Sequence, residues 1–327
     1  MAISGDAKDT GNQSRVNSRW PKVGSTVRVC DARSILKTLD SKGRSEGLPF
    51  LPQMLAYLGQ TLQVTRRVNN VCVQQPDGMY FGKLDGCVLL SGNRCDGQAQ
   101  GGCQMACPMM WKTSWLESHE SNADRDTGDS FEAAERAALH ELEELIQKNI
   151  STVDPDGQRL VSCQATELFN IAPRRSQTDV SQYINEINLN RVSVISLASS
   201  LCSGLLARVK GQSNGIAGTR KTTPVADLNL QPGDRVRVKT KDQIISTLDV
   251  NGKNRGLWFD PVMLRYCGQT LNVSARISRI VDERTGKLIT MKTPSIVLED
   301  LHCQPEDRRF CSRLLHLFWR EIWLEQV

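Results

Sequence analysis

The amino-acid sequence predicts an α+β fold that is mainly β, built as two small barrels from a tandem repeat, each closed by a C-terminal helix, with a helical insert between them. Three observations predict this fold. A pattern of about 90 residues occurs twice in the chain. Each copy carries short β-prone segments separated by turn residues, and the stretch between the copies carries an apolar stripe with helical spacing.

The two copies match in the same order and with nearly the same spacing. In the first copy the matched residues include Gly24, Val27, Val29, Gly47, Phe50, Gly59, Cys95, Cys103, Trp111 and Trp115. Their counterparts are Gly233, Val236, Val238, Gly256, Phe259, Gly268, Cys303, Cys311, Trp319 and Trp323. The repeat therefore divides the 327 residues into four parts: a disordered leader (1–22), a first repeat with a cysteine site (23–117), a helical insert and linker (118–223), and a second repeat (224–327).

Within each copy the elements follow the same order. A strand with alternating valines comes first (27–29 and 236–238), then a short helix (34–39 and 243–248). A strand (61–68 and 270–277), a hairpin turn (75–78 and 282–286) and a further strand (87–90 and 295–298) follow. Several short strands with one short helix indicate a small barrel. The Gly-x-x-Val-x-Val opening at Gly24 and Gly233 resembles that of SH3-like barrels, including the KOW type.

The insert has helical spacing instead. Asp129 can cap a helix with Glu132 three residues on, and an apolar stripe then continues to about residue 149. A second helix is expected from Val192 to Arg208, packing between the barrels or, alternatively, lying on a membrane surface. Residues 211–223 are rich in Gly, Ser and Thr and indicate a linker.

Charge and composition limit which partners and which cellular location we expect for the protein. Lys and Arg number 41 against 36 Asp and Glu, a net charge of +5, which is weak for a dedicated nucleic-acid binder. The polar start of the chain lacks the apolar run of a signal peptide, so we expect a cytoplasmic protein. The most apolar stretch, 192–206, is shorter than the roughly 20 residues that cross a bilayer, so no membrane span is expected.

Eleven cysteines in a chain without an export signal do not indicate a disulfide framework, because cytosolic thiols are kept reduced. The remaining explanations for these cysteines are metal ligation and simple burial. Four cysteines stand singly in apolar surroundings, and we expect each to be a small buried hydrophobe. They are Cys30, Cys72, Cys87 and Cys202.

The first copy holds the cysteines that indicate a metal site. Residues 103–117 are expected to be helical, so that Cys103 and Cys107 lie on one face, and the Gly-rich loop before them lets Cys95 fold back. A structural zinc site needs four ligands, and the fourth is expected to be Cys163, with Cys87 and His119 as competitors. Buried reduced thiols and a redox-active thiol pair are the alternatives to a metal.

The second copy has Leu315 in the place of Cys107, so a second site would need substitute ligands. The candidates for a possible second metal site are Cys267, Cys303, Cys311 and His316, with His302 beside them. The alternative is that this copy has lost the metal. The paired tryptophans of both copies are expected to lie on helices that cover the barrel cores.

Residues 233–238, 254–261 and 318–325, together with the Cys-Gln-Ala-Thr-Glu-Leu sequence at Cys163, resemble an uncharacterised bacterial family of duplicated SH3-like-barrel proteins with cysteine motifs. The resemblance covers both repeats. Members are often encoded in biosynthetic gene clusters, such as those for surface polysaccharides or specialised metabolites, so the resemblance implies an accessory or biosynthetic role. The first copy departs from the family at Leu58, where a cysteine is common.

Three functions follow as hypotheses. The first is a non-catalytic, metal-stabilised binding or accessory module for a protein partner in a bacterial biosynthetic pathway, since the sequence has no nucleotide-binding loop, zinc-protease helix or nucleophile elbow. The second is an enzyme, or enzyme subunit, of natural-product or polysaccharide biosynthesis that uses catalytic zinc or an iron–sulfur cluster. No catalytic residue can be assigned for it.

The third hypothesis is nucleic-acid binding through the second barrel. The basic residues Arg235, Arg237, Lys239 and Lys241 alternate along the chain and would project from one face of a strand. The first copy keeps only Arg28 of this pattern, so we expect a solvated strand face instead.

Overall fold

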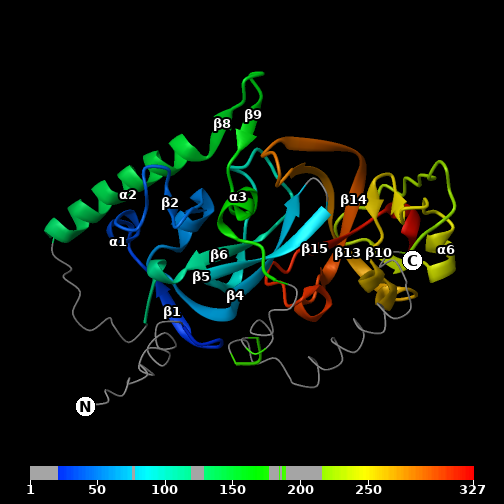
Figure 1. The fold of residues 1–327 in the computed structure, drawn as a ribbon, viewed down its shortest axis with the longest axis horizontal. Helices are drawn as coiled ribbons and strands as arrows, with labels where there is room; N and C mark the ends of the chain where they lie inside the picture. Colours follow the sequence, from blue (N-terminus) through cyan, green and yellow to red (C-terminus); the bar gives the residue numbers. More distant parts are fainter. Residues whose placement is uncertain (1–20, 76–77, 119–128, 177–183, 185, 189–215) are drawn as a thin grey trace, which may run out of the picture.

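The computed structural model describes residues 21–75, 78–118, 129–176, 184, 186–188 and 216–327 (Figure 1). This part of the chain is mainly β with a few helices, as the sequence predicts. The expected leader lies almost wholly outside the described residues, and so do the expected helix from Val192 to Arg208, Cys202 and His119.

The first repeat alternates short helices with strands. Its elements are β1 (Thr26–Val29), α1 (Ala32–Leu36), β2 (Arg44–Ser45), β3 (Leu48–Pro49), the 3-10 helix η2 (Pro52–Tyr57), β4 (Thr61–Gln75), β5 (Gly78–Arg94), β6 (Pro108–Lys112), the 3-10 turn η3 (Thr113–Trp115) and β7 (Leu116–Ser118). The expected helix near residue 34 is present as α1, which begins earlier because the Asp31 side chain accepts a hydrogen bond from the Ser34 N–H (2.8 Å).

The insert contributes α2 (Asp129–Asn149), the hairpin β8 (Ser151–Val153) and β9 (Arg159–Val161), and α3 (Gln164–Ile171). The prediction of a helix from Asp129 to about residue 149 is confirmed, and its stripe residues Leu142 and Ile146 are buried. Figure 1 shows α2 beside α1, at the end of the molecule away from the second repeat. Glu135 of α2 accepts a hydrogen bond from the Ala32 N–H (2.5 Å), so the insert helix also caps α1.

The second repeat gives the same series. Its elements are β10 (Arg235–Val238), α6 (Lys241–Ile245), β11 (Lys253–Asn254), β12 (Leu257–Trp258), η5 (Pro261–Tyr266), β13 (Thr270–Val281), β14 (Leu288–His302), η6 (Pro305–Arg308), β15 (His316–Trp319), η7 (Glu321–Trp323) and β16 (Leu324–Gln326). Here η6 falls in the part of the repeat where the first copy carries its Gly-rich cysteine loop.

Each repeat forms one five-stranded antiparallel sheet. The strand order is β6-β5-β4-β1-β7 in the first and β15-β14-β13-β10-β16 in the second. The register also repeats, with Val29 opposite Leu116 and Val238 opposite Leu324. In the described sheets the two edge strands do not pair with each other, so the sheets are open and the closed barrels expected from the sequence are not seen.

The prediction that a helix closes each repeat is also wrong. Residues 103–107 form a loop, and the residues that follow form β6, η3 and β7, while the second copy gives β15, η7 and β16. Residues 109–112 of β6 are all buried, which is a pattern of two buried strand faces rather than one helical stripe. In each copy the first tryptophan therefore lies on a strand, and the second, four residues later, lies on the 3-10 turn that follows it.

The four tryptophans nevertheless lie in the cores, each with 0 % of its surface exposed. Trp115 packs edge-on against Phe50 with ring centroids 5.1 Å apart, and Trp323 packs against Phe259 at the same distance. The indole N–H of Trp115 donates to the Thr38 hydroxyl at 3.0 Å. The indole N–H of Trp323 donates to the Thr247 hydroxyl at the same distance. The cores of the two repeats thus share even this hydrogen bond.

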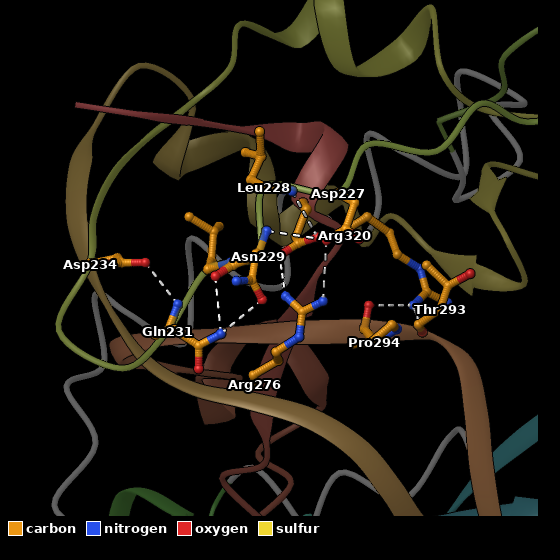
Figure 2. Close-up of polar contacts among 11 residues, drawn as sticks. Asp227, Leu228, Asn229, Gln231, Asp234, Arg276, Thr293, Pro294 and Arg320 are labelled. Atoms are coloured by element: carbon orange, nitrogen blue, oxygen red, sulfur yellow. Dashed lines mark hydrogen bonds and ion pairs between the residues drawn. The ribbon is translucent and has the colours of Figure 1, made fainter.

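A carboxylate of the second repeat holds the segment that precedes β10 (Figure 2). Glu321 accepts hydrogen bonds from the N–H groups of Leu228 (3.2 Å) and Leu230 (2.9 Å) and forms an ion pair with Arg276. Its neighbour Arg320 donates to two carbonyls of β14, and burial lowers the pKa of this guanidinium to about 10. Both charges are therefore satisfied where the chain enters the second repeat.

The tryptophan cores yield a stability prediction. Replacing Trp115 or Trp323 by Ala removes a fully buried ring and should lower the free energy of unfolding by about 3–5 kcal/mol. Phe169→Ala is the control, because Phe169 is 59 % exposed and its loss should cost about 0.5 kcal/mol or less. Denaturant titration measures all three. Tryptophan variants as stable as the control would show that these rings do not support their cores.

Candidate functional site

The cysteine loop joins β5 to β6 and is folded back on itself. The Gly97 carbonyl accepts hydrogen bonds from the N–H groups of Gly102 (2.9 Å) and Cys103 (3.2 Å). At the base of the loop, the Cys95 N–H donates to the Cys107 carbonyl at 2.9 Å. Three cysteines separated along the chain are therefore brought to one place by backbone hydrogen bonds.

Gly97 is the residue that this loop requires. Its φ is +69°, and a Cβ atom placed there would lie 1.7 Å from the Cys103 carbonyl oxygen. A side chain is excluded by both the left-handed backbone and the close approach of Cys103. The return of the chain toward Cys95 thus depends on glycine, as the sequence predicts, although the residues after the loop are not helical.

Cys163 comes to the same place from the insert. It precedes α3, and its neighbour Gln164 is buried against β6. The Gln164 amide accepts from the Met110 N–H (2.8 Å) and donates to the Met110 carbonyl (2.8 Å), as a neighbouring strand would. It also donates to the Pro49 carbonyl (3.2 Å). One side chain therefore fixes the start of α3, and with it Cys163, beside the cysteine loop.

These four cysteines line one cavity of about 40 Å³, which is room for more than one water molecule. Its other walls include Met105, Met109 and Met110 from the first repeat and Val281, Arg313 and Leu315 from the second. Of the competing fourth ligands, Cys87 is not in the cavity wall and its thiol donates to the Asp85 carbonyl (3.6 Å). The structure brings together Cys95, Cys103, Cys107 and Cys163.

Burial disfavours the thiolate form of three of these cysteines. It raises the pKa of Cys95 to about 12, with the nearby Cys163 and Cys103 thiols adding to the effect, and it raises the pKa of Cys107 and of Cys163. Within the described ranges, no group of three or more His, Cys, Asp or Glu side chains is arranged to hold a metal ion. The four thiols thus surround a space rather than meet at one point.

The second repeat completes the site by holding the loop. The Gln104 side-chain oxygen accepts from the N–H groups of Ser278 (2.7 Å) and Arg279 (2.9 Å) on β13, and the Gln104 N–H donates to the Arg279 carbonyl (2.9 Å). The Val281 N–H points at the Cys103 sulfur at 3.4 Å. This docking falls at an irregularity of β13, between Ile277 and Arg279, where the pairing with β14 shifts register.

The possible second metal site is not assembled in the same way. His316 pairs across the sheet with His302, and burial lowers the pKa of both imidazoles. Cys267 follows η5 as its C-cap, where burial raises the pKa of its thiol and the Lys241 ammonium opposes that rise. Cys311 instead contacts a residue of the first repeat, so the four candidates do not form one group in the part of the chain that the structure describes.

That contact was missed by sequence reasoning. The Cys72 N–H donates to the Cys311 sulfur at 3.1 Å, and the neighbouring Cys311 thiol lowers the pKa of Cys72. Burial raises the pKa of Cys311, and that of Cys303 to about 11, with Cys72 adding to it. Cys72 stands alone in its strand, so no spacing rule could pair it with a cysteine about 240 residues away.

The basic residues of the second repeat are divided between solvent and internal bonds. Arg235 and Arg237 of β10 are exposed while Val236 and Val238 are buried, as alternation predicts. Arg237 lies 3.5 Å from a carboxylate oxygen of Glu325, and the Lys239 ammonium donates to the Ile322 carbonyl (2.9 Å). Two of the four basic side chains thus have a partner within their own repeat, while Arg235 and Arg237 lie on an exposed strand face.

Comparison of the chain with protein-family models, curated proteins and solved structures gives no match. Among the described helices, none is both long and apolar enough to cross a bilayer.

A second prediction concerns Gly97 and distinguishes the effect of its left-handed backbone from the effect of its close contact with Cys103. Gly97→Ala and Gly92→Ala both place a side chain at a left-handed φ (+69° and +70°), but a Cβ at Gly92 meets nothing within 4 Å. Both should lose about 1–3 kcal/mol from backbone strain. Gly97→Ala should lose more and should expose Cys95 and Cys103 to a thiol reagent, measured by the rate of Ellman labelling. Equal labelling of the two variants would mean that Gly97 does not shape the site.

Proposed function

We propose that the chain is a non-catalytic binding or accessory module in which a metal ion, zinc, is held by the thiolates of Cys95, Cys103, Cys107 and Cys163. The observation that carries the proposal is that these four cysteines, from the loop of the first repeat and from the insert, line a single cavity closed by the second repeat. The metal would fix three parts of the chain to one another.

The chemistry of the cavity supports a soft metal. Four thiolates are a full ligand set for structural zinc, and thiolate sulfur selects zinc, copper(I) or iron–sulfur clusters over oxygen-preferring ions. Four ligands leave no open position on zinc for a substrate, which favours a structural role. Binding requires that the thiols lose their protons and move inward, because they surround a space of about 40 Å³.

An iron–sulfur cluster is the second candidate. The observation that favours it is the same cavity volume, because a cluster fills space between four separated cysteines that a single ion does not. In that case the chain would be an enzyme or an enzyme subunit with redox or radical chemistry. Elemental analysis and the absorbance spectrum of anaerobically purified protein distinguish the two: a colourless zinc protein supports the first candidate, and a brown iron protein supports the second.

The repeats supply the surface of the proposed module. We infer that each is a variant of the SH3-like, KOW-like barrel, supported by a first strand that pairs with both β4 and the last strand, β7, and by the 3-10 turn before that last strand. The partner would be a protein of the same biosynthetic pathway. Nucleic-acid binding through β10 is the weaker hypothesis, because Arg237 and Lys239 already have partners.

The proposed site is tested by metal content. Purified protein should hold about one zinc ion per chain, and the double variant Cys103→Ser, Cys107→Ser should lose it, since two of the four thiolates are removed. The matched control is the double variant Cys30→Ser, Cys87→Ser, whose two cysteines are buried but lie outside the cavity wall. Metal content unchanged in the first variant would disprove the ligand set.

The raised thiol pKa values set the pH dependence of binding. Cys95, Cys107 and Cys163 have pKa values above their ordinary range, so they are protonated at neutral pH, and zinc must displace those protons. Zinc affinity should therefore rise with pH, by up to about tenfold per pH unit for each proton released. Competition with a chromophoric chelator at several pH values between 6.5 and 8 measures this slope. An affinity independent of pH would mean that the ligands are not these thiols.

A further inference from the structure

A second pair of cysteines lies where the two repeats meet, apart from the thiol cavity. Cys72 is in β4 of the first repeat, and Cys311 lies between η6 and β15 of the second. Asn70 and Cys311 form a parallel β-bridge, and the Ser312 N–H donates to the Asn70 carbonyl at 2.7 Å. The Cys72 N–H lies 3.1 Å from the Cys311 sulfur. Backbone pairing between the repeats thus holds the two cysteines in contact.

A buried cation lies beside this pair. The Arg313 guanidinium donates to the Cys72 carbonyl (3.0 Å), and its Nη1 atom is 3.9 Å from the Cys72 sulfur. Glu283 accepts two hydrogen bonds from the same guanidinium, at 2.8 and 2.5 Å, and fixes its orientation. A positive group at this distance stabilises a thiolate, and the thiolate is the reactive form of cysteine.

We propose that Cys72 and Cys311 form a reversible disulfide that ties the first repeat to the second when the protein meets a peroxide. Cys72, beside Arg313, is the nucleophile, and Cys311, whose thiol already contacts it, is the resolving residue. The pair is buried, with Cys72 6 % and Cys311 0 % exposed, so a small oxidant of the hydrogen peroxide class suits it better than a bulky disulfide.

The reaction balances in two steps. The Cys72 thiolate attacks one peroxide oxygen, the O–O bond breaks, and the products are the Cys72 sulfenic acid and hydroxide. The Cys311 sulfur then attacks the Cys72 sulfur, the S–O bond breaks, and water leaves with the proton of the Cys311 thiol. The hydroxide takes up the proton released when Cys72 ionised. In total, two thiols and one hydrogen peroxide give one disulfide and two waters, and the thiols supply the two electrons.

The disulfide would close a loop of about 240 residues that contains the whole insert. Separation of the repeats would then require breakage of a covalent bond as well as the β-bridge and the hydrogen bonds. The relative placement of the two repeats would be locked under oxidation and released by a reducing thiol.

Peptide mapping tests the proposal on the folded, full-length protein. After treatment with hydrogen peroxide and alkylation, trypsin should release residues 68–83, with Cys72, linked to residues 310–313, with Cys311; each peptide holds a single cysteine. We expect most of the free forms of both peptides to be lost, and the linked species to disappear after dithiothreitol. The melting temperature should rise on oxidation and return on reduction.

The controls use neighbouring cysteines. Peptide 84–94 carries Cys87, which is 0 % exposed and should stay reduced under the same conditions. Cys303→Ala should leave the Cys72–Cys311 link intact, whereas Cys72→Ala and Cys311→Ala should each abolish it and the rise in melting temperature. Linkage of Cys311 to Cys303 instead, or oxidation of Cys72 no faster than that of Cys87, would overturn the proposal.

Discussion

The structure depends on how the cysteine loop of the first repeat lies against β13 of the second. Gln104 supplies both an acceptor and a donor to the β13 backbone, so the loop meets β13 through hydrogen bonds to its N–H and carbonyl groups, as a neighbouring strand would. A loop of three cysteines and several glycines has little apolar surface of its own with which to hold a shape. The thiol cavity therefore exists because two halves of a duplicated chain are packed together.

Much of this architecture could be predicted from the sequence. The duplication, the alternating valines of the first strands, the hairpins and the helix from Asp129 all follow from local patterns, and each is present. The return of the chain through the Gly-rich loop could be predicted because glycine tolerates tight turns, and the structure adds the close approach of Cys103 to Gly97. The choice of Cys163 as a neighbour of the loop also agrees with the structure, although the residue that places it, Gln164, gave no recognisable signal.

The rest could not be predicted for physical reasons. Trp111 and Trp115 are four apart, a spacing that indicates a helix when residues are counted along one face. In the structure the first tryptophan lies on a strand and the second on a 3-10 turn, and both reach the same core. The contact between Cys72 and Cys311 is tertiary, and it follows from a β-bridge between repeats that no pattern within either repeat specifies.

The cavity and the tryptophan cores differ in how much of the chain they need. Val281, Arg313 and Leu315 belong to the second repeat, and Cys163 belongs to the insert. A single repeat on its own would keep its tryptophan core and its threonine hydrogen bond, but solvent would reach the cysteine loop. The cavity is therefore a property of the whole chain, whereas the core is a property of each repeat.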